Sequence, residues 1–186
     1  TLAVTNLDEV APIFTSAAVA TAIAENTGAG QVVYTAVSTD TVDYMSGSTT
    51  YSLSGTDALL FTINGTTGAV TLTASPNYEA KPSYSFNVIA TDAANNATTK
   101  AVTLAVTNLD EVAPIVTSLA TATIAENIGA GQVVYTAVST DTVDYVSGAT
   151  TYSLTGTDAA LFTINGSTGA VTLTGYAGGN RGVNAI

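Results

Sequence analysis

The side chains able to do chemistry in this sequence are almost all carboxylates. Fourteen acidic residues accompany three basic ones, and histidine, cysteine and tryptophan are absent. Without histidine and cysteine, the usual serine and cysteine hydrolase arrangements are excluded and zinc loses its preferred ligands. Paired carboxylates could still hydrolyse a glycoside, but the aromatic residues that would hold a sugar lie in strand-like patterns. We therefore predict that the chain is not an enzyme.

The acids are grouped rather than scattered. All except Asp57 and Asp158 lie in predicted linkers or at the ends of predicted strands, which a sandwich fold collects at its two poles. An isolated aspartate in a loop is ordinarily a turn residue. Two like charges ~5 Å apart, however, repel by roughly 3 kcal/mol at an effective dielectric of ~20. Ca²⁺ binds 6–8 oxygen ligands and would convert this repulsion into attraction, so the grouping predicts a calcium site.

The charge balance narrows the possible partners further. The formal net charge of -11 argues against binding to nucleic acid or to an anionic membrane surface, both of which require basic patches. No apolar run approaches the ~18 residues of a membrane span, so membrane insertion is not expected. Absent cysteine removes disulfides but is compatible with secretion.

The sequence contains a long internal repeat. Residues 1–12 read TLAVTNLDEVAP, and residues 103–114 repeat these letters without change. Residues 23–36 and 124–137 differ at one position only, and the match continues to Thr174. A period of about 100 residues is the size of a complete sandwich domain and too long for a solenoid unit. We therefore expect domains repeated head to tail.

Each repeat is predicted to be all-β. Over 84–90 and 102–106 every second residue is apolar, as in half-buried antiparallel strands, and no segment has a sustained helical period. Seven predicted strands favour an Ig-like β-sandwich. The expected organisation is the last strand and linker of a preceding repeat over 1–11, a complete repeat over 12–110, and a second repeat over 111–186. This second repeat should hold the first five strands and lack the last two.

Five short motifs give the chain a family resemblance. They are Ala24-Glu25-Asn26, Asp40-Thr41-Val42-Asp43, Asn77-Tyr78-Glu79, Ala90-Thr91-Asp92 and the linker Asn108-Leu109-Asp110-Glu111-Val112-Ala113-Pro114. In this order they resemble the xEN, D-A-D, D-Y-E, A-T-D and D-x-N-D-N-A-P motifs of the cadherin family. The sequence looks like the bacterial branch of that family, which occurs in tandem arrays in large surface adhesins.

The resemblance implies a cadherin-type Greek-key sandwich and a set of Ca²⁺ ligands at each repeat junction. In the family, one domain supplies the xEN and Y-E glutamates and the linker, and the next supplies the D-A-D and A-T-D acids. The implied ligands of the central junction are Glu25, Glu79, Asn108, Asp110, Glu111, Asp141 and Asp144. Those of the upstream junction are Asp8, Glu9, Asp40, Asp43 and Asp92.

Some positions depart from the family pattern. Asn77 and Asn108 replace aspartates, Val112 replaces a ligand asparagine, and Val42 stands where the second aspartate of D-A-D belongs. Fewer charged ligands predict weaker binding, in the ~10⁻⁴–10⁻³ M range of extracellular modules.

The expected function is that of a calcium-stabilised structural and adhesive repeat, a rigid spacer in a large secreted or cell-surface protein. Its partners would be calcium, neighbouring repeats of the same chain, and a homophilic or heterophilic surface protein or a polysaccharide. Two alternatives remain open at this level, a carbohydrate- or protein-binding module and an accessory domain of a secreted enzyme. Exposed aromatic residues gathered on one face would favour the first, and catalytic sequence in the parent protein would favour the second.

Overall fold

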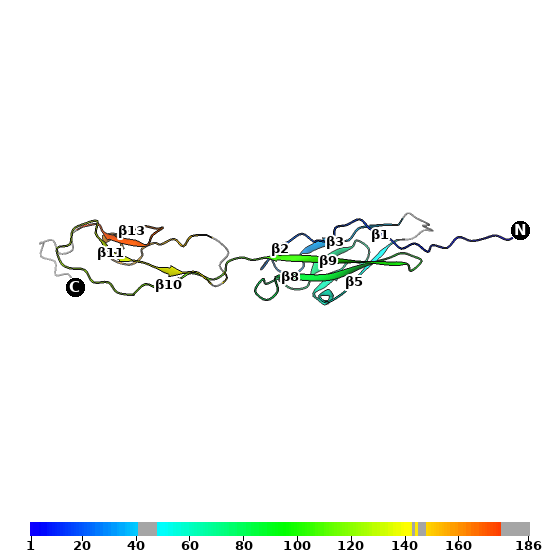
Figure 1. The fold of residues 1–186 in the computed structure, drawn as a ribbon, viewed down its shortest axis with the longest axis horizontal. Coiled ribbons are helices and arrows are strands. Elements are labelled where there is room, and N and C mark those ends of the chain that lie inside the picture. The colour runs from blue at the N-terminus through cyan, green and yellow to red at the C-terminus, as the bar shows by residue number, and fades with distance from the viewer. Residues whose placement is uncertain (41–47, 143, 145–147, 176–186) are drawn as a thin grey trace. The chain divides into compact units, whose positions relative to one another are not determined.

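The computed structural model describes residues 1–40, 48–142, 144 and 148–175, and the chain divides into two compact units (Figure 1). Unit 1 comprises Thr1–Leu109 and unit 2 comprises Asp110–Ile186. The described residues form strands and two single-turn 3-10 helices. None of these helices has the length and apolar character that a membrane-spanning helix requires.

Unit 1 is an all-β sandwich. Its elements are β1 (Ile13–Phe14), β2 (Ile23–Ala24), β3 (Val32–Thr35), β4 (Ser38–Thr39), β5 (Thr50–Ser54), η1 (Ala58–Leu60), β6 (Phe61–Ile63), β7 (Ala69–Leu72), β8 (Ser83–Thr91) and β9 (Ala97–Thr107). One sheet has the strand order β2-β9-β8-β5, and the other has the order β3-β7-β6, with β1 and β4 paired beside it. β1 and β2 are two pieces of the first predicted strand, and β3 and β4 are two pieces of the second, so the predicted seven strands are present.

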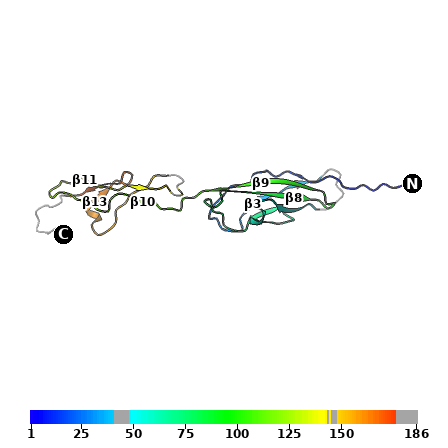
Figure 2. The ribbon, with the colours of Figure 1, turned by 60° about the horizontal axis from the view of Figure 1, so that its bottom comes forward.

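The long strands β8 and β9 dominate the first sheet (Figures 1 and 2). They pair antiparallel from Ser83↔Ala105 to Thr91↔Ala97, while β2 runs parallel to β9. Their apolar residues point inward, as the alternation predicted: Phe86 is 1% exposed, and Val88, Val102 and Leu104 are 0% exposed. The predicted antiparallel sandwich is therefore confirmed for this unit.

The core lies between the two sheets. Phe61 of β6 packs on Phe86 at 4.5 Å between ring centroids and on Tyr84 at 5.5 Å. Tyr34 of β3 meets Phe86 edge-on at 6.2 Å. Such tilted and edge-on pairs are the favoured aromatic geometries and contribute beyond their buried area. This packing holds the strand ends, and the acids that follow them, in fixed positions.

Unit 2 repeats only part of this architecture. Its elements are β10 (Ile115–Val116), β11 (Val133–Thr136), β12 (Ser139–Thr140), η2 (Ala159–Leu161), β13 (Phe162–Ile164) and β14 (Ala170–Leu173). They reproduce the pairing of β1 with β4 and of β3 with β7 and β6. Among the described residues of unit 2, no counterpart of β8 or β9 is present.

The prediction of five strands in the second repeat is wrong in one respect. Residues 151–155 correspond to β5 but do not form a strand, and residues 124–125, which correspond to β2, do not either. In unit 1, β5 pairs only with β8 and β2 pairs only with β9. The same sequences therefore remain irregular in unit 2 because their hydrogen-bonding partners are missing from its described part.

Candidate metal centre

Three aspartates meet at one pole of unit 1. Asp8 lies in the segment before β1, Asp40 follows β4, and Asp92 follows β8. The pairing of Ile13 with Thr39 brings the first two together. Each of the three aspartates offers one carboxylate oxygen, and these oxygens all lie within 4.8 Å of one another. The structure thus gathers acids that are up to 84 residues apart in sequence, a separation that only the sandwich fold closes.

Asn96 fixes two members of this group. Its backbone N–H donates to Asp92 Oδ1 at 2.8 Å, and its side-chain Nδ2 donates to Asp92 Oδ2 at 3.0 Å and to the carbonyl oxygen of Asp8 at 2.8 Å. The β8–β9 hairpin can place Asn96 there because Asn95 adopts a left-handed conformation with φ of 74°. Sequence reasoning missed Asn96, and the available signal was an amide four residues after Asp92 at the tip of a predicted hairpin.

Asp40 is the aspartate of this group whose buried charge is not balanced by any hydrogen bond from the described residues. Both of its carboxylate oxygens are buried, and neither has a hydrogen-bond partner among the described residues. Burial raises the pKa of Asp40 above its ordinary value, and the negative charges of Asp8 and Asp92 raise that pKa further. An unpartnered buried carboxylate is costly, since it loses its hydration and gains nothing in return. A hard divalent cation would supply the missing partner, and an all-oxygen donor set suits Ca²⁺.

Unit 2 holds the counterparts of two of these aspartates. Asp110 and Asp141, which correspond to Asp8 and Asp40, line one cavity of 240 Å³ within the unit. Asp110 accepts a hydrogen bond from the Val112 N–H at 3.3 Å, as Asp8 does from the Val10 N–H at 3.3 Å. Asp141 Oδ1 is buried without a hydrogen-bond partner in the described part of the chain. A counterpart of Asp92 is absent from the described residues of unit 2, so this copy of the site has fewer acids.

Glu25 occupies the other pole of unit 1 and is 1% exposed. Its Oε2 accepts a hydrogen bond from the Tyr78 N–H at 2.8 Å, and its Oε1 accepts one from the Leu109 N–H at 2.7 Å. The carboxylate therefore joins the chain entering β8 to the chain leaving β9. Each oxygen keeps a further lone pair, so this clamp leaves room for a metal ion.

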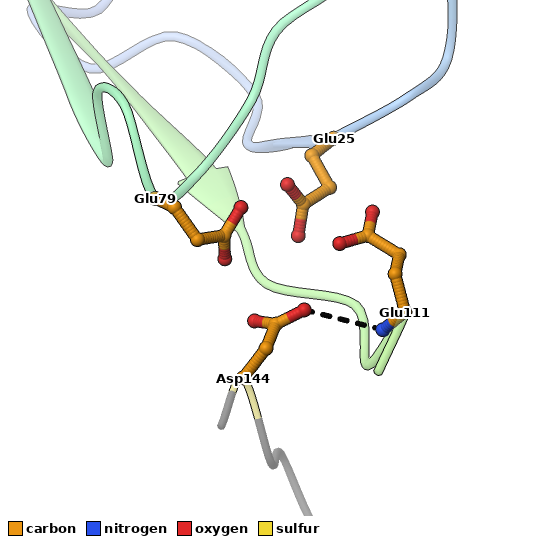
Figure 3. A group of neighbouring side chains, drawn as sticks. All are labelled: Glu25, Glu79, Glu111 and Asp144. Carbon is orange, nitrogen blue, oxygen red and sulfur yellow. Dashed lines mark hydrogen bonds between the residues drawn. The ribbon is translucent and has the colours of Figure 1, made fainter. Parts of the chain in front are cut away.

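Figure 3 draws four carboxylates, two from each unit. Within unit 1, a carboxylate oxygen of Glu79 lies within 4.8 Å of one of Glu25, and Glu79 is exposed. Within unit 2, Asp144 Oδ2 accepts a hydrogen bond from the Glu111 N–H at 3.1 Å. Asp144 has a left-handed backbone with φ of 59°. Within each unit, therefore, two carboxylates lie close enough to each other to share a cation.

The remaining predicted ligands fall into three situations. Asn108 Oδ1 is buried, with no hydrogen-bond partner among the described residues. Glu9 is exposed and lies outside the three-aspartate group. Asp43 lies outside the described residues, so its position relative to Asp40 is not part of the structure.

Asp57, which the sequence excluded from the ligand pattern, has a structural role. It is 7% exposed, its Oδ2 accepts a hydrogen bond from the Ser85 N–H at 2.7 Å, and its Oδ1 pairs with Lys81 Nζ at 3.1 Å. Burial alone would raise the pKa of Asp57, but the Ser85 hydrogen bond and the Lys81 charge outweigh it and hold that pKa below its ordinary value. Asp57 thus anchors the start of β8 to the turn before β6.

Comparison with curated proteins finds relatives that are much longer than this chain. The chain is 28% identical over 169 residues to protocadherin Fat 4 of Mus musculus, a match covering 89% of this chain. It is also 28% identical over 170 residues to protocadherin Fat 4 of Homo sapiens, covering 90% of this chain. In each case the chain spans 3% of the relative's length.

Comparison with solved structures identifies the fold. Human protocadherin-24 EC1-2 matches with a TM-score of 0.66 and 23% identity, over 90% of this chain and 79% of that one. Mouse cadherin-23 EC22-24 matches with a TM-score of 0.61 and 23% identity, over 95% of this chain and 58% of that one. At these identities the likeness concerns the fold, which is the predicted cadherin-type β-sandwich.

The family model described as "Cadherin domain" matches residues 20–107. These residues include β2 to β9, and with them Glu25, Asp40, Glu79 and Asp92 of the predicted motifs. The sandwich topology and the structural neighbours agree with this match. We conclude that residues 20–107 are a domain of the cadherin family.

Proposed function

We propose that this chain is a calcium-stabilised repeat, a structural and adhesive spacer within a larger extracellular protein. The observation that supports the proposal best is the Asp8–Asp40–Asp92 group, with oxygens within 4.8 Å of one another and both oxygens of Asp40 buried without a partner among the described residues. Three acids placed this closely by separate strand ends are costly unless a cation neutralises them. The relatives' names, protocadherin and cadherin, support the adhesive part of the proposal.

In the proposed mechanism, binding of the ion is thermodynamically linked to the ordered arrangement of the three aspartates. Asp8, Asp40 and Asp92 would hold the ion through carboxylate oxygens, and Asn96 would orient Asp92 and the Asp8 backbone. When bound, Ca²⁺ supplies the positive charge that the acids lack. An ion that binds only the ordered arrangement stabilises it by RT ln(1 + [L]/Kd). The leading segment, which ends in Asp8, would then be held firmly against the sandwich, as a spacer requires.

The family resemblance extends the proposal to the other predicted ligands. Under it, the acids and the amide of the second set also bind calcium, namely Glu25, Glu79, Asn108, Asp110, Glu111, Asp141 and Asp144. Glu9 and Asp43 complete the first set in the same way. Neighbouring repeats of the same protein would be the first partners, with a surface protein or polysaccharide as the adhesive one. The bacterial-adhesin context rests on the motifs alone and stays a prediction.

Thermal melting tests the proposal. The melting temperature of unit 1 should rise in millimolar Ca²⁺ relative to chelator, and should rise much less in Mg²⁺, which gives up its water ligands reluctantly. The substitution Asp40→Asn should have opposite effects on stability in chelator and in Ca²⁺. In chelator it removes repulsion and leaves the protein as stable as wild type or more so, whereas in Ca²⁺ it removes a ligand and is destabilising. The matched control Asp158→Asn, outside both ligand sets, should keep the full Ca²⁺ response. Equal melting temperatures in all three solutions would contradict the proposal.

A further inference from the structure

Tyr51 of β5 contacts the strand end that carries Asp40. Its hydroxyl oxygen accepts a hydrogen bond from the Ser38 N–H at 3.1 Å and forms a second hydrogen bond with Ser38 Oγ at 2.9 Å. Ser38 is the first residue of β4, and Asp40 follows β4 directly. The ring is half-buried and packs against the core of unit 1, which sets the position of the hydroxyl. Tyr51 therefore fixes the backbone from which the Asp40 side chain extends.

The backbone of Tyr51 is tied to the strand that ends just before Asp92. Tyr51 pairs with Ala90 and Thr50 pairs with Thr91 across β5 and β8. The Thr50 hydroxyl also donates to the Thr91 carbonyl oxygen at 3.3 Å. Thr91 is the last residue of β8, and Asp92 is the next residue of the chain. Since directly opposed residues of antiparallel strands lie only about 5 Å apart, the Tyr51 backbone has a fixed position relative to Asp92.

The ring of Tyr51 also contacts the strand that follows Asp8. It packs on Phe14 of β1 with 6.4 Å between the ring centroids and an interplanar angle of 43°. Lys100 of β9 holds the same strand, because its ammonium lies 5.8 Å from the Phe14 ring centroid and donates to the Ser16 carbonyl oxygen. Tyr51 thus contacts, through its hydroxyl, backbone and ring, the three segments that carry the three aspartates.

The segment that carries Asp40 needs this support because its own strand is short. β4 has two residues and pairs only with the two residues of β1 in the described part of the chain. The Asp40 carboxylate is buried without a hydrogen-bond partner there, and one of its oxygens lies within 4.8 Å of oxygens of Asp8 and Asp92. Like charges at this separation repel, so a loosely held segment would move away when no ion is bound. A site whose ligands are already held in place binds more tightly, since less order has to be gained on binding.

The second repeat preserves the hydroxyl contact under different conditions. The Tyr152 hydroxyl accepts a hydrogen bond from the Ser139 N–H at 3.1 Å and bonds Ser139 Oγ at 2.8 Å, two residues before Asp141. Residues 151–155 are not in a strand, so strand pairing is not what brings this hydroxyl to its serine. The contact between tyrosine and serine is therefore a feature of the strand end itself.

We propose that Tyr51 is a positioning residue of the three-aspartate site. Its hydroxyl holds Asp40 at the distance from Asp8 and Asp92 that lets all three carboxylates bind one Ca²⁺ ion. This inference rests on the proposed function and adds to it a residue that is not a ligand. Outer groups that orient metal ligands often affect affinity nearly as much as the ligands do. Removing the hydroxyl should therefore weaken Ca²⁺ binding although every ligand remains.

A Ca²⁺ titration of the full chain carrying Tyr51→Phe tests the proposal. The substitution keeps the ring and its packing on Phe14 and removes only the hydroxyl. The Kd, measured from the ¹H–¹⁵N NMR shifts of the amides of residues 92–96, should rise about three- to tenfold, as expected for the loss of one or two hydrogen bonds that act on a ligand.

The matched control is Tyr34→Phe, which removes a hydroxyl that also forms two hydrogen bonds in unit 1. These bonds are to Ser16 Oγ at 2.7 Å and to the Ala17 carbonyl oxygen at 2.7 Å, in the segment after β1. Both variants should melt at a lower temperature than wild type in chelator. Only Tyr51→Phe should raise the Kd for Ca²⁺, because only its hydroxyl acts on the strand end before Asp40.

A double variant tests whether Tyr51 acts through Asp40. When Asp40 is already replaced in Asp40→Asn, adding Tyr51→Phe should change the Kd by less than about twofold, since coupled residues are not additive. The inference would be overturned by a wild-type Kd in Tyr51→Phe, by an equal rise in Tyr34→Phe, or by an undiminished effect in the Asp40→Asn background. Wild-type chain that does not bind Ca²⁺ at all would instead contradict the proposed function, and this inference with it.

Discussion

At the scale of single residues, the three-aspartate group owes its geometry to Asn96 as much as to the acids. The amide holds the Asp92 carboxylate through two hydrogen bonds and the Asp8 carbonyl through a third. Only Asp40 is left without a donor in the described part of the chain. Most of the group is therefore rigid before any ion arrives, which lowers the ordering cost of binding.

The repeat supplies a matched pair for measuring the role of Asp57. Asp57→Asn should lower the free energy of unfolding of unit 1 by about 1–2 kcal/mol at pH 7, since it weakens a charge-assisted hydrogen bond and an ion pair in a buried site. Asp158→Asn, at the equivalent position of unit 2 but without counterparts of Ser85 and Lys81 among the described residues, should cost under about 0.5 kcal/mol. Denaturant unfolding of both variants checks this.

The contribution of Asp57 to stability should depend on pH in one direction. The pKa of Asp57 is lower in the folded protein than in the unfolded chain. Its contribution to stability is therefore present above the unfolded value of about 3.8 and is lost as pH falls through the folded pKa. The difference between wild type and Asp57→Asn should shrink steadily below about pH 4. A difference that grows on acidification would contradict the assignment.

The sequence predicted part of this residue-scale description. Asp8, Asp40 and Asp92 could be nominated because strand-end acids collect at the poles of a sandwich and the family order assigns them to one cluster. The anchoring roles of Asn96 and Asp57 could not, since each depends on which backbone groups a turn presents to the side chain. Composition alone does not specify those contacts.

At the scale of elements, the turn before β7 shows how tightly the second sheet is closed. Gly68 has φ of 69°, and a Cβ atom there would lie 2.3 Å from the carbonyl oxygen of Ala36. The Ala36 N–H donates to the Gly68 carbonyl at 2.9 Å, so the two segments cannot easily separate. The equivalent Gly169 has φ of 70° and a similar approach of 2.2 Å to Ala137.

Replacing Gly68 should therefore be costly. Gly68→Ala combines a left-handed backbone with a steric clash and should destabilise unit 1 by about 2–4 kcal/mol. Gly28→Ala is the matched control, because Gly28 has φ of 86° with nothing within 4 Å of the added Cβ. It should cost about 1 kcal/mol from backbone strain alone. Equal destabilisation of the two variants in urea would show that the contact with Ala36 is unimportant.

The elements also show where sequence prediction reaches its limit. The alternation over 84–90 and 102–106 predicted β8 and β9 because each strand has one buried face. Residues 151–155 carry the same kind of pattern as Thr50–Ser54, yet only the latter form a strand. Strand formation there depends on a neighbouring strand, which local sequence does not encode.

At the scale of the whole molecule, the two units should differ in stability. Unit 1 has a sandwich core with both sheets present, whereas unit 2 lacks the β8–β9 layer among its described residues. Domains are only marginally stable even when complete, so the loss of that layer leaves little free energy to protect the remaining strands. We therefore expect that residues 113–186 alone are not stable as a monomer.

Native-state amide exchange measures this difference. Amides in the centres of β8 and β9 should exchange at least about 100-fold more slowly than those in β11, β13 and β14, since exchange of core strands follows the stability of their own cooperative unit. The spectra of one sample contain both sets, so each serves as the control for the other. Equal protection in the two units would show that unit 2 folds as firmly as unit 1.

The central claim, that Asp8, Asp40 and Asp92 form a calcium site, is tested most directly by a ¹H–¹⁵N NMR titration of the chain with Ca²⁺. The account predicts saturable shifts of the amides around Asp8, Asp40 and the 92–96 hairpin tip, with a Kd in the ~10⁻⁴–10⁻³ M range. In Asp40→Asn these shifts should require much higher Ca²⁺. Shifts that are absent, or that are equally large and unsaturable around Asp57 and Asp158, would contradict it.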